Sequence, residues 1–79
     1  MTVKVLLSSS LRRYVPQYDP SSGVDLKVDK GMSVAEVCRL MNVPVEKIKI
    51  VMVDGRHGSL KYLLKGDERI ALFPAVGGG

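Results

Sequence analysis

The central stretch of the sequence, residues 33 to 42, reads Ser33-Val34-Ala35-Glu36-Val37-Cys38-Arg39-Leu40-Met41-Asn42. Ser33 followed three residues later by Glu36 is typical of a capping box, in which the two residues satisfy backbone donors at a helix start. Apolar residues recur at the spacing of one buried helix face, namely Val34, Val37, Cys38 and Met41. Asn42 suits a left-handed helix end, and Pro44 prevents continuation. We therefore predict one amphipathic helix that begins after Ser33 and ends near Met41.

The segments on both sides of this helix alternate between apolar and polar residues, as half-buried strands do. Thr2 to Ser8 and Val24 to Val28 precede the helix and are joined by a proline-containing loop. Lys47 to Val53 and Glu68 to Phe73 follow it, whereas residues 56 to 66 fit either a short helical turn or an irregular strand. A hairpin, a helix and two further strands favour an α+β fold. We predict a β-grasp with a mixed sheet of four to five strands packed on one main helix.

Length and composition indicate one small folded domain. The chain has 79 residues, and its 46% hydrophobic and 25% charged residues are typical of a folded protein. We expect a domain at residues 1–73 and a flexible carboxyl-terminal tail at 74–79. No apolar run approaches the roughly 20 residues that span a bilayer, and the first residues do not resemble a secretion signal. We therefore expect a cytoplasmic protein with no membrane partner.

The chain has few residues that support metal or redox chemistry. A single cysteine, Cys38, and a single histidine, His57, exclude an internal disulfide and a Cys/His zinc site. We expect no metal and no bound cofactor, with Cys38 in the core and His57 in a solvated loop. The net charge of +4 suits an acidic partner, but the basic residues are scattered and aromatics are few, so we expect no nucleic-acid partner. Arg12 and Arg13 are expected to be solvated.

The final residues are Phe73-Pro74-Ala75-Val76-Gly77-Gly78-Gly79. Pro74 lacks a backbone donor, so the last strand is expected to end at Phe73. A frayed end is one interpretation of this stretch, because termini are often loose. The other starts from glycine, which has no Cβ and can pass through a channel as wide as its backbone. Such a tail delivers one reactive group, the terminal carboxylate, to an enzyme that activates it as an acyl-adenylate and replaces AMP with sulfur.

Several motifs taken together resemble the ThiS/MoaD family of ubiquitin-like sulfur-carrier proteins over the whole chain. They are Leu11-Arg12 after the first strand, the helix start at Ser33, Val53-Asp54-Gly55, Gly66-Asp67-Glu68 and the terminal glycines. The resemblance implies a carrier and not an enzyme. It also implies that Gly79 is adenylated and converted to a thiocarboxylate, that Gly77 and Gly78 form the tail, and that the activating enzyme uses ATP.

The ending Phe-Pro-x-Val-x-Gly-Gly is most similar to the MoaD-like small subunit of molybdopterin synthase. The resemblance therefore implies sulfur donation in molybdopterin or tungstopterin biosynthesis. Thiamine carriers share the Val-Gly-Gly-Gly ending, carriers for cysteine synthesis have a similar Pro-Ala-Val tail, and a ubiquitin-like protein modifier needs the same terminus. The implied partners are an E1-like adenylating enzyme of the MoeB/ThiF type and either a MoaE-like synthase large subunit or a thiazole synthase.

A docking surface is expected beside the tail. In the last strand Ile70 and Leu72 should face the helix, which places Ala71 and Phe73 on the outer face. In this family the Phe at the position of Phe73 docks onto the activating enzyme and the synthase; the alternative is that Phe73 closes the edge of the core. Asp67 and Glu68 are expected to be turn charges or contacts at the rim of a basic partner. In the strand from Lys47 to Val53, Val51 and Val53 are expected on the same outer face, and Ile48, Ile50 and Met52 on the other. The predicted docking residues are Phe73, Pro74, Val76, Ala71, Val51 and Val53.

Overall fold

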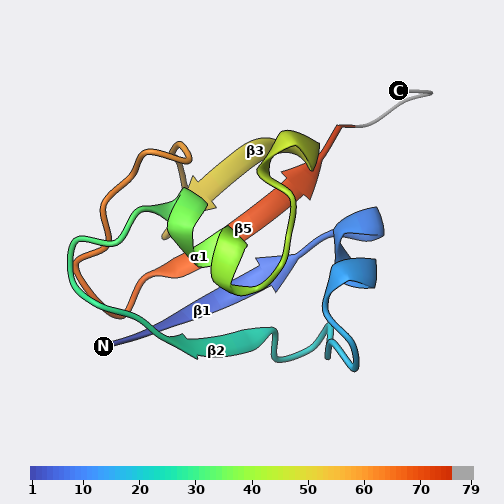
Figure 1. Ribbon diagram of the computed structural model, residues 1–79, viewed down its shortest axis with the longest axis horizontal. Helices are drawn as coiled ribbons and strands as arrows, with labels where there is room; N and C mark the ends of the chain where they lie inside the picture. The colour runs from blue at the N-terminus through green and yellow to red at the C-terminus, as the bar shows by residue number, and fades with distance from the viewer. Residues whose placement is uncertain (76–79) are drawn as a thin grey trace.

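One α-helix covers one face of a five-stranded sheet in the computed structural model, which describes residues 1–75 (Figure 1). In chain order the elements are β1 (Thr2–Leu7), the 3-10 helix η1 (Ser9–Tyr14), β2 (Val24–Lys27), α1 (Val34–Leu40), the 3-10 helix η2 (Val45–Lys47), β3 (Ile48–Val53), β4 (Arg56–His57) and β5 (Arg69–Pro74). Within the described residues no helix is both long and apolar enough to cross a bilayer.

The strand order is β2-β1-β5-β3-β4, and the first and last strands lie side by side in the centre. β1 and β5 run parallel, whereas the other neighbouring strands are antiparallel. This mixed sheet of five strands with one main helix confirms the predicted β-grasp. Its consequence for function is that the chain leaves the sheet from a central strand, at the end where η1 and η2 also lie (Figure 1).

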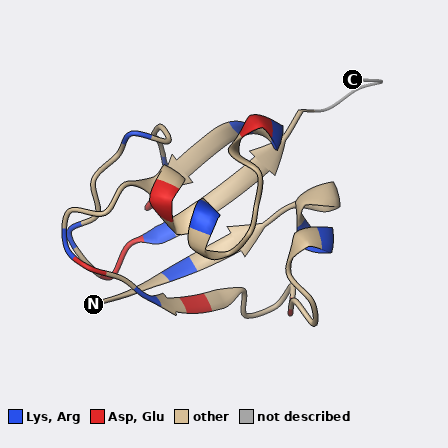
Figure 2. Cartoon of the chain, viewed as in Figure 1, with Lys and Arg blue, Asp and Glu red and all other residues tan. Residues whose placement is uncertain are grey.

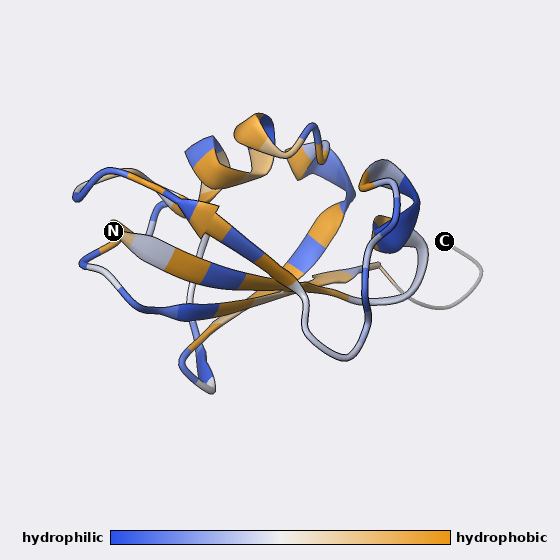
Figure 3. Cartoon of the chain, turned by 90° about the horizontal axis from the view of Figure 1, so that it is seen from below, coloured by the Kyte–Doolittle hydropathy of each residue, from blue (hydrophilic) through white to orange (hydrophobic). Residues whose placement is uncertain are grey.

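The core lies between α1 and the facing side of β1 and β5, as the two layers in Figure 3 show. The helix contributes Val34, Val37 and Cys38, all fully buried, as the apolar spacing predicts. The capping box is also confirmed, because the Glu36 amide donates to Ser33 Oγ at 3.1 Å and the Ser33 amide donates to Glu36 Oε1 at 3.0 Å. Burial raises the pKa of the Cys38 thiol to about 11, which keeps it protonated and inert at neutral pH.

The segment whose structure the sequence left open, residues 56–66, is mostly irregular. It begins as β4, which follows β3 through the Asp54-Gly55 turn, and both turn residues have positive φ (50° and 80°). It then crosses to the start of α1, where the amides of Val34 and Ala35 donate to the carbonyl oxygens of Tyr62 and Leu60. These hydrogen bonds satisfy backbone donors that a helix start leaves unpaired. They also fix residues 58–66, which we call the crossover, against the first turn of α1.

Glu68 is a buried structural residue, and the prediction of a turn charge or a partner contact for it was wrong. Its side chain is only 3% exposed. Its carboxylate accepts hydrogen bonds from the amides of Lys65 (2.7 Å) and Gly66 (2.8 Å) and from the Tyr62 hydroxyl (3.0 Å). Burial raises the pKa of Glu68, but these hydrogen bonds outweigh it and leave the pKa lowered. The carboxylate therefore holds the crossover against the start of β5.

We predict that Glu68→Gln lowers the free energy of unfolding by about 2 kcal/mol at neutral pH, because an amide cannot accept all three donors. The matched change Asp67→Asn, at an exposed neighbour, should cost about 0.5 kcal/mol or less. The folded-state pKa of Glu68 is lowered, so its carboxylate contributes to the free energy of unfolding above the unfolded-state pKa of about 4.3. This contribution is lost as the pH falls through the folded-state pKa. Urea titrations at several pH values check this. A gap between wild type and Glu68→Gln that stays constant into acid would contradict it.

Candidate functional site

The face of the sheet opposite α1 carries the candidate site. On β5, Ile70 and Leu72 are fully buried against the helix side, and Ala71 and Phe73 alternate to the other face, where they are half-buried. The predicted orientation of β5 is therefore confirmed. Phe73 is not among the residues of the buried core cluster, which favours the docking interpretation of this ring over the core interpretation.

The predicted orientation of β3 was wrong. Val51 lies opposite Leu72 and Val53 lies opposite Ile70, and directly opposed residues of neighbouring strands share a face. Val51 and Val53 are accordingly buried, at 6% and 7% exposure, and they belong to the core and not to the docking surface.

Two features of β3 explain why the sequence did not reveal this orientation. Both faces of the strand are apolar, so alternation does not distinguish the inner from the outer face. In addition, the register with β5 shifts between Ile48 and Ile50, since Ile48 lies opposite Pro74 and Ile50 already opposes Phe73. Such a bulge changes the phase of the strand, so Ile48 packs against the core while Ile50 faces outward, 41% exposed.

The outer face instead presents a different apolar set, which we call the outer-face patch. Ile50 lies opposite Phe73, Met52 lies opposite Ala71, and Ala71 also neighbours Leu6 on β1. The patch therefore runs across three adjacent strands, and it comprises Leu6, Ile50, Met52, Ala71 and Phe73. The sequence analysis missed Leu6, Ile50 and Met52, and only the pairing with β5 identifies them. Ile50 is exposed and the other four residues are half-buried, so the patch is partly accessible. A contiguous apolar surface of this kind is typical of a protein-binding site.

Charged and polar residues border the outer-face patch. Lys4 and Arg69 lie side by side next to it, and Lys4 forms an ion pair with Asp25 of β2 at 3.0 Å. His57 lies on β4 opposite Met52, and it is exposed, as expected for a solvated residue. A polar border around an apolar centre is the common anatomy of a protein interface.

The tail begins directly beside the outer-face patch. Pro74 is buried and is the last residue of β5, so the strand ends one residue later than expected. We call Pro74 and the exposed Ala75 the tail root. The predicted site residues Val76, Gly77, Gly78 and Gly79 lie outside the described residues. Phe73 and the tail root are thus consecutive in the chain. Because Pro74 is buried, it is not an exposed docking residue as predicted, and Ala75 is the exposed residue of the tail root.

Arg12 and Tyr18 act on the fold and do not form part of the candidate site. Arg12 Nε donates to the Leu7 carbonyl oxygen at 2.9 Å, and the Leu7 amide donates to the Tyr18 hydroxyl at 2.7 Å. The Arg12 guanidinium also lies over the Tyr18 ring, 5.8 Å from its centroid. These contacts cover the edge of β1 beyond the last pair with β2. Arg12 and Arg13 are both exposed, as predicted, and Arg12 has this structural role in addition.

Within residues 1–75 the arrangement supports binding and shows no assembled reactive centre. No group of three or more His, Cys, Asp or Glu side chains in this range could hold a metal ion. The described thiol is buried. The chemistry that the outer-face patch supports by itself is recognition of a protein.

Comparison with known proteins connects this geometry to a family. The family model described as Mut7-C ubiquitin matches residues 1–77. A search of the curated proteins found no significant match. Among solved structures, small archaeal modifier protein 1 from Haloferax volcanii is similar with a TM-score of 0.69 and 18% identity over 95% of this chain and 98% of that one. A putative molybdopterin converting factor, subunit 1, from Pyrococcus furiosus is similar with a TM-score of 0.71 and 18% identity over 96% of this chain and 99% of that one. At these identities the likeness is one of fold.

The orientation of β3 makes a direct prediction about two adjacent residues. Ile50→Asp, on the outer face, should lower the free energy of unfolding by about 1 kcal/mol or less, because the new charge stays in water. Val51→Asp should cost more than about 4 kcal/mol, because it places an unpaired carboxylate in the core. Urea unfolding followed by circular dichroism distinguishes the two. Equal losses, or the reverse order, would mean that β3 presents its other face to α1.

Proposed function

Because the chain belongs to the Mut7-C ubiquitin family and is a ubiquitin-like protein of the ThiS/MoaD type, we propose that it carries sulfur on the carboxylate of Gly79. The observation that carries this proposal is that Phe73 of the outer-face patch lies on β5, the strand whose sequence continues directly into the glycine-rich tail. The six residues from Pro74 to Gly79 reach at most about 20 Å when extended. A partner bound at Phe73 therefore has the terminal carboxylate within reach of its own active site.

The proposed chemistry has two steps, both carried out by an E1-like adenylating enzyme of the MoeB/ThiF type. The Gly79 carboxylate oxygen attacks the α-phosphorus of ATP, and pyrophosphate leaves. A hydrosulfide sulfur then attacks the acyl carbon, AMP leaves, and a thiocarboxylate remains. The chain contributes the reacting carboxylate and the surface that positions it, and the enzyme supplies the catalytic groups. Binding energy used for positioning in this way lowers the entropic barrier of the first step.

The glycines of the tail fit this role. Gly77, Gly78 and Gly79 have no side chains that would obstruct a narrow channel. We propose that residues 74–79 work as the functional tail, with Pro74 anchoring its root in β5. Cys38, the one cysteine, is buried with a raised pKa, so it does not compete with the terminus as a sulfur acceptor.

The proposed acceptor is the pterin precursor of molybdopterin or tungstopterin, bound by a MoaE-like synthase large subunit. The Phe73-Pro74 ending supports this assignment, since it resembles the small subunit of molybdopterin synthase. The alternative routes for the sulfur are a thiazole synthase and the synthesis of cysteine. Each of the three routes needs the same thiocarboxylate.

Protein modification is the second candidate function. Its support is the similar fold of small archaeal modifier protein 1, which matches as well as the molybdopterin converting factor does. A modifier would use the same adenylate but transfer the Gly79 carbonyl to a lysine amine, with formation of an isopeptide bond. The two functions therefore differ in the nucleophile of the second step.

The proposal predicts a defined change of mass. With a cognate E1-like enzyme, ATP and a sulfur source, the chain should gain the difference between one sulfur and one oxygen atom, and fragmentation should locate it on Gly79. Cys38→Ala should gain the same mass, because the thiol is not the acceptor. Sulfur found on Cys38 would contradict the proposal. Lysine conjugates without any thiocarboxylate would instead establish the modifier function.

A further inference from the structure

A hollow of about 370 Å³ lies beside the tail root, between η1 and η2. It is separate from the outer-face patch, and its lining comes from three elements that are far apart in the sequence. These residues are Ser10, Arg13 and Tyr14 from η1, Glu46 and Lys47 from η2, and Pro74 and Ala75 at the end of β5. We call it the tail-root hollow.

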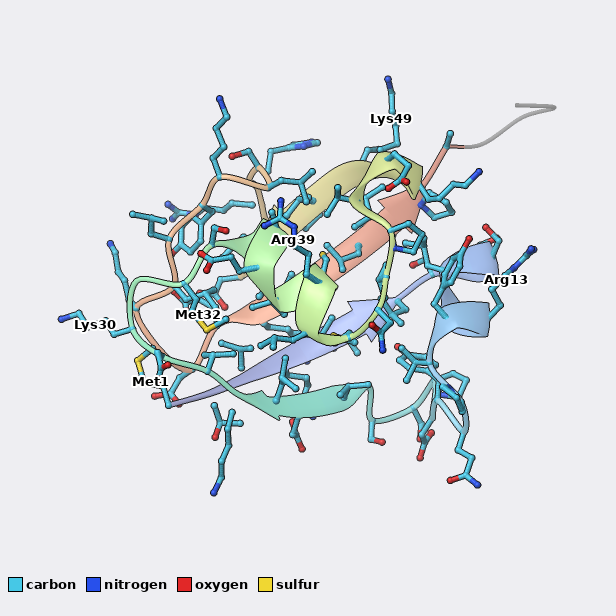
Figure 4. The ribbon with its side chains drawn as sticks, in the orientation of Figure 1. Met1, Arg13, Lys30, Met32, Arg39 and Lys49 are labelled. Carbon is cyan, nitrogen blue, oxygen red and sulfur yellow. The ribbon has the colours of Figure 1, made fainter. Side chains whose placement is uncertain are left out.

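The tail-root hollow carries one cation from η1, Arg13, and one from η2, Lys47, which lies next to Glu46. Arg13 on η1 and Lys47 on η2 are exposed. Lys4 and Asp25 form the one ion pair within residues 1–75. Arg13 and Lys47 are therefore not paired with a carboxylate in this range. Lys49 extends the positive charge onto β3, and Figure 4 shows Arg13 and Lys49 on opposite sides of the point where the chain leaves β5. Figure 2 shows basic positions on η1 and around η2, with an acidic position beside those of η2.

We propose that the tail-root hollow binds carboxylate side chains at the rim of the channel through which the activating enzyme receives the tail. This inference rests on the proposed function. A guanidinium from η1 and an ammonium from η2 in one hollow are suited to carboxylates, and the Arg13 guanidinium can bind one in a bidentate manner. The hollow and the outer-face patch share no residue, but Pro74 of the hollow follows Phe73 of the patch directly in the chain. An enzyme that contacts the patch and encloses the tail must also cover the hollow.

The composition of the hollow favours an acidic protein surface over a nucleic acid. Glu46 stands beside the two cations and would repel the continuous negative charge of a phosphate backbone. Tyr14 is the one aromatic residue among its lining residues, which gives little surface for stacking bases. Separate carboxylates on a protein can contact Arg13 and Lys47 and leave Glu46 in solvent.

Charges at the border of an interface act mainly on association. They attract the partner over distances comparable to the Debye length, which is about 10 Å at 0.1 M salt, and they contribute less once the complex has formed. Loss of the hollow's charge should therefore raise KM for the chain in its activation, lower the association rate and leave kcat nearly unchanged. The effect should disappear at high ionic strength.

The test compares two double charge reversals in ATP–pyrophosphate exchange catalysed by the E1-like enzyme of the same organism. Arg13→Glu/Lys47→Glu changes the hollow, and Lys27→Glu/Lys30→Glu makes the same change in net charge at exposed residues of β2 and the turn after it. At about 0.05 M salt we expect KM to rise about tenfold or more for the hollow variant and about twofold or less for the control. At about 0.5 M salt the two should agree within about twofold. Arg13→Gln/Lys47→Gln should give an intermediate KM, and circular dichroism should show that all variants are folded.

The outcomes separate this inference from the proposed function. If the wild-type chain supports no exchange, the proposed function fails and this inference fails with it. If the wild type is active and both reversals raise KM equally, the effect is one of net charge and the hollow is not a binding site. If a single-stranded oligonucleotide binds the wild type and the control but not the hollow variant, the hollow binds nucleic acid and the inference is overturned.

Discussion

The burial of Ile70 and Leu72 in the core between the sheet and α1 is the constraint on which the rest of the structure depends. Ile70 lies beside Val5 and Leu72 beside Leu7, in the parallel pair at the centre of the sheet, and all four are at most 2% exposed. Complete burial of one such side chain contributes about 1.5–3 kcal/mol. Because side chains alternate along a strand, the same burial sends Ala71 and Phe73 to the outer face. The core therefore determines which residues a partner meets just before the tail.

The polar interactions described above stabilise the helix layer, the loops and the border of the outer face, and they leave the outer-face patch free. The crossover segment is held by the start of α1 and by Glu68, and the end of β1 is covered by Arg12 and Tyr18. In residues 1–75 every buried side-chain nitrogen or oxygen has a hydrogen-bond partner. The outer-face patch takes no part in these networks, so a partner can cover it without breaking them.

The sequence was sufficient where a local signal had a single interpretation. The capping box at Ser33 and Glu36 located the helix start, and the alternation around Ile70 oriented β5, because only one phase of that strand is strongly apolar. It failed for β3 for two reasons. Isoleucine and valine occupy both faces of the strand, and a bulge that no residue type predicts shifts its register with β5. It also failed for Glu68. The sequence shows only a carboxylate next to a Gly-Asp turn, whereas in the structure two backbone amides and a tyrosine hydroxyl of the preceding loop donate hydrogen bonds to it. Both failures concern tertiary contacts, which a local pattern does not contain.

The most direct test of the central claim separates binding from reaction. Deletion of Gly79 shortens the tail by one residue and changes no described contact. Because the outer-face patch is intact, the shortened chain should bind the activating enzyme with an affinity within about twofold of that of the wild type. The same chain should form neither adenylate nor thiocarboxylate, because its carboxylate stops short of the reacting position. A chain without Gly79 that still accepts sulfur would contradict the account, and so would one that no longer binds although circular dichroism and its thermal melt match the wild type.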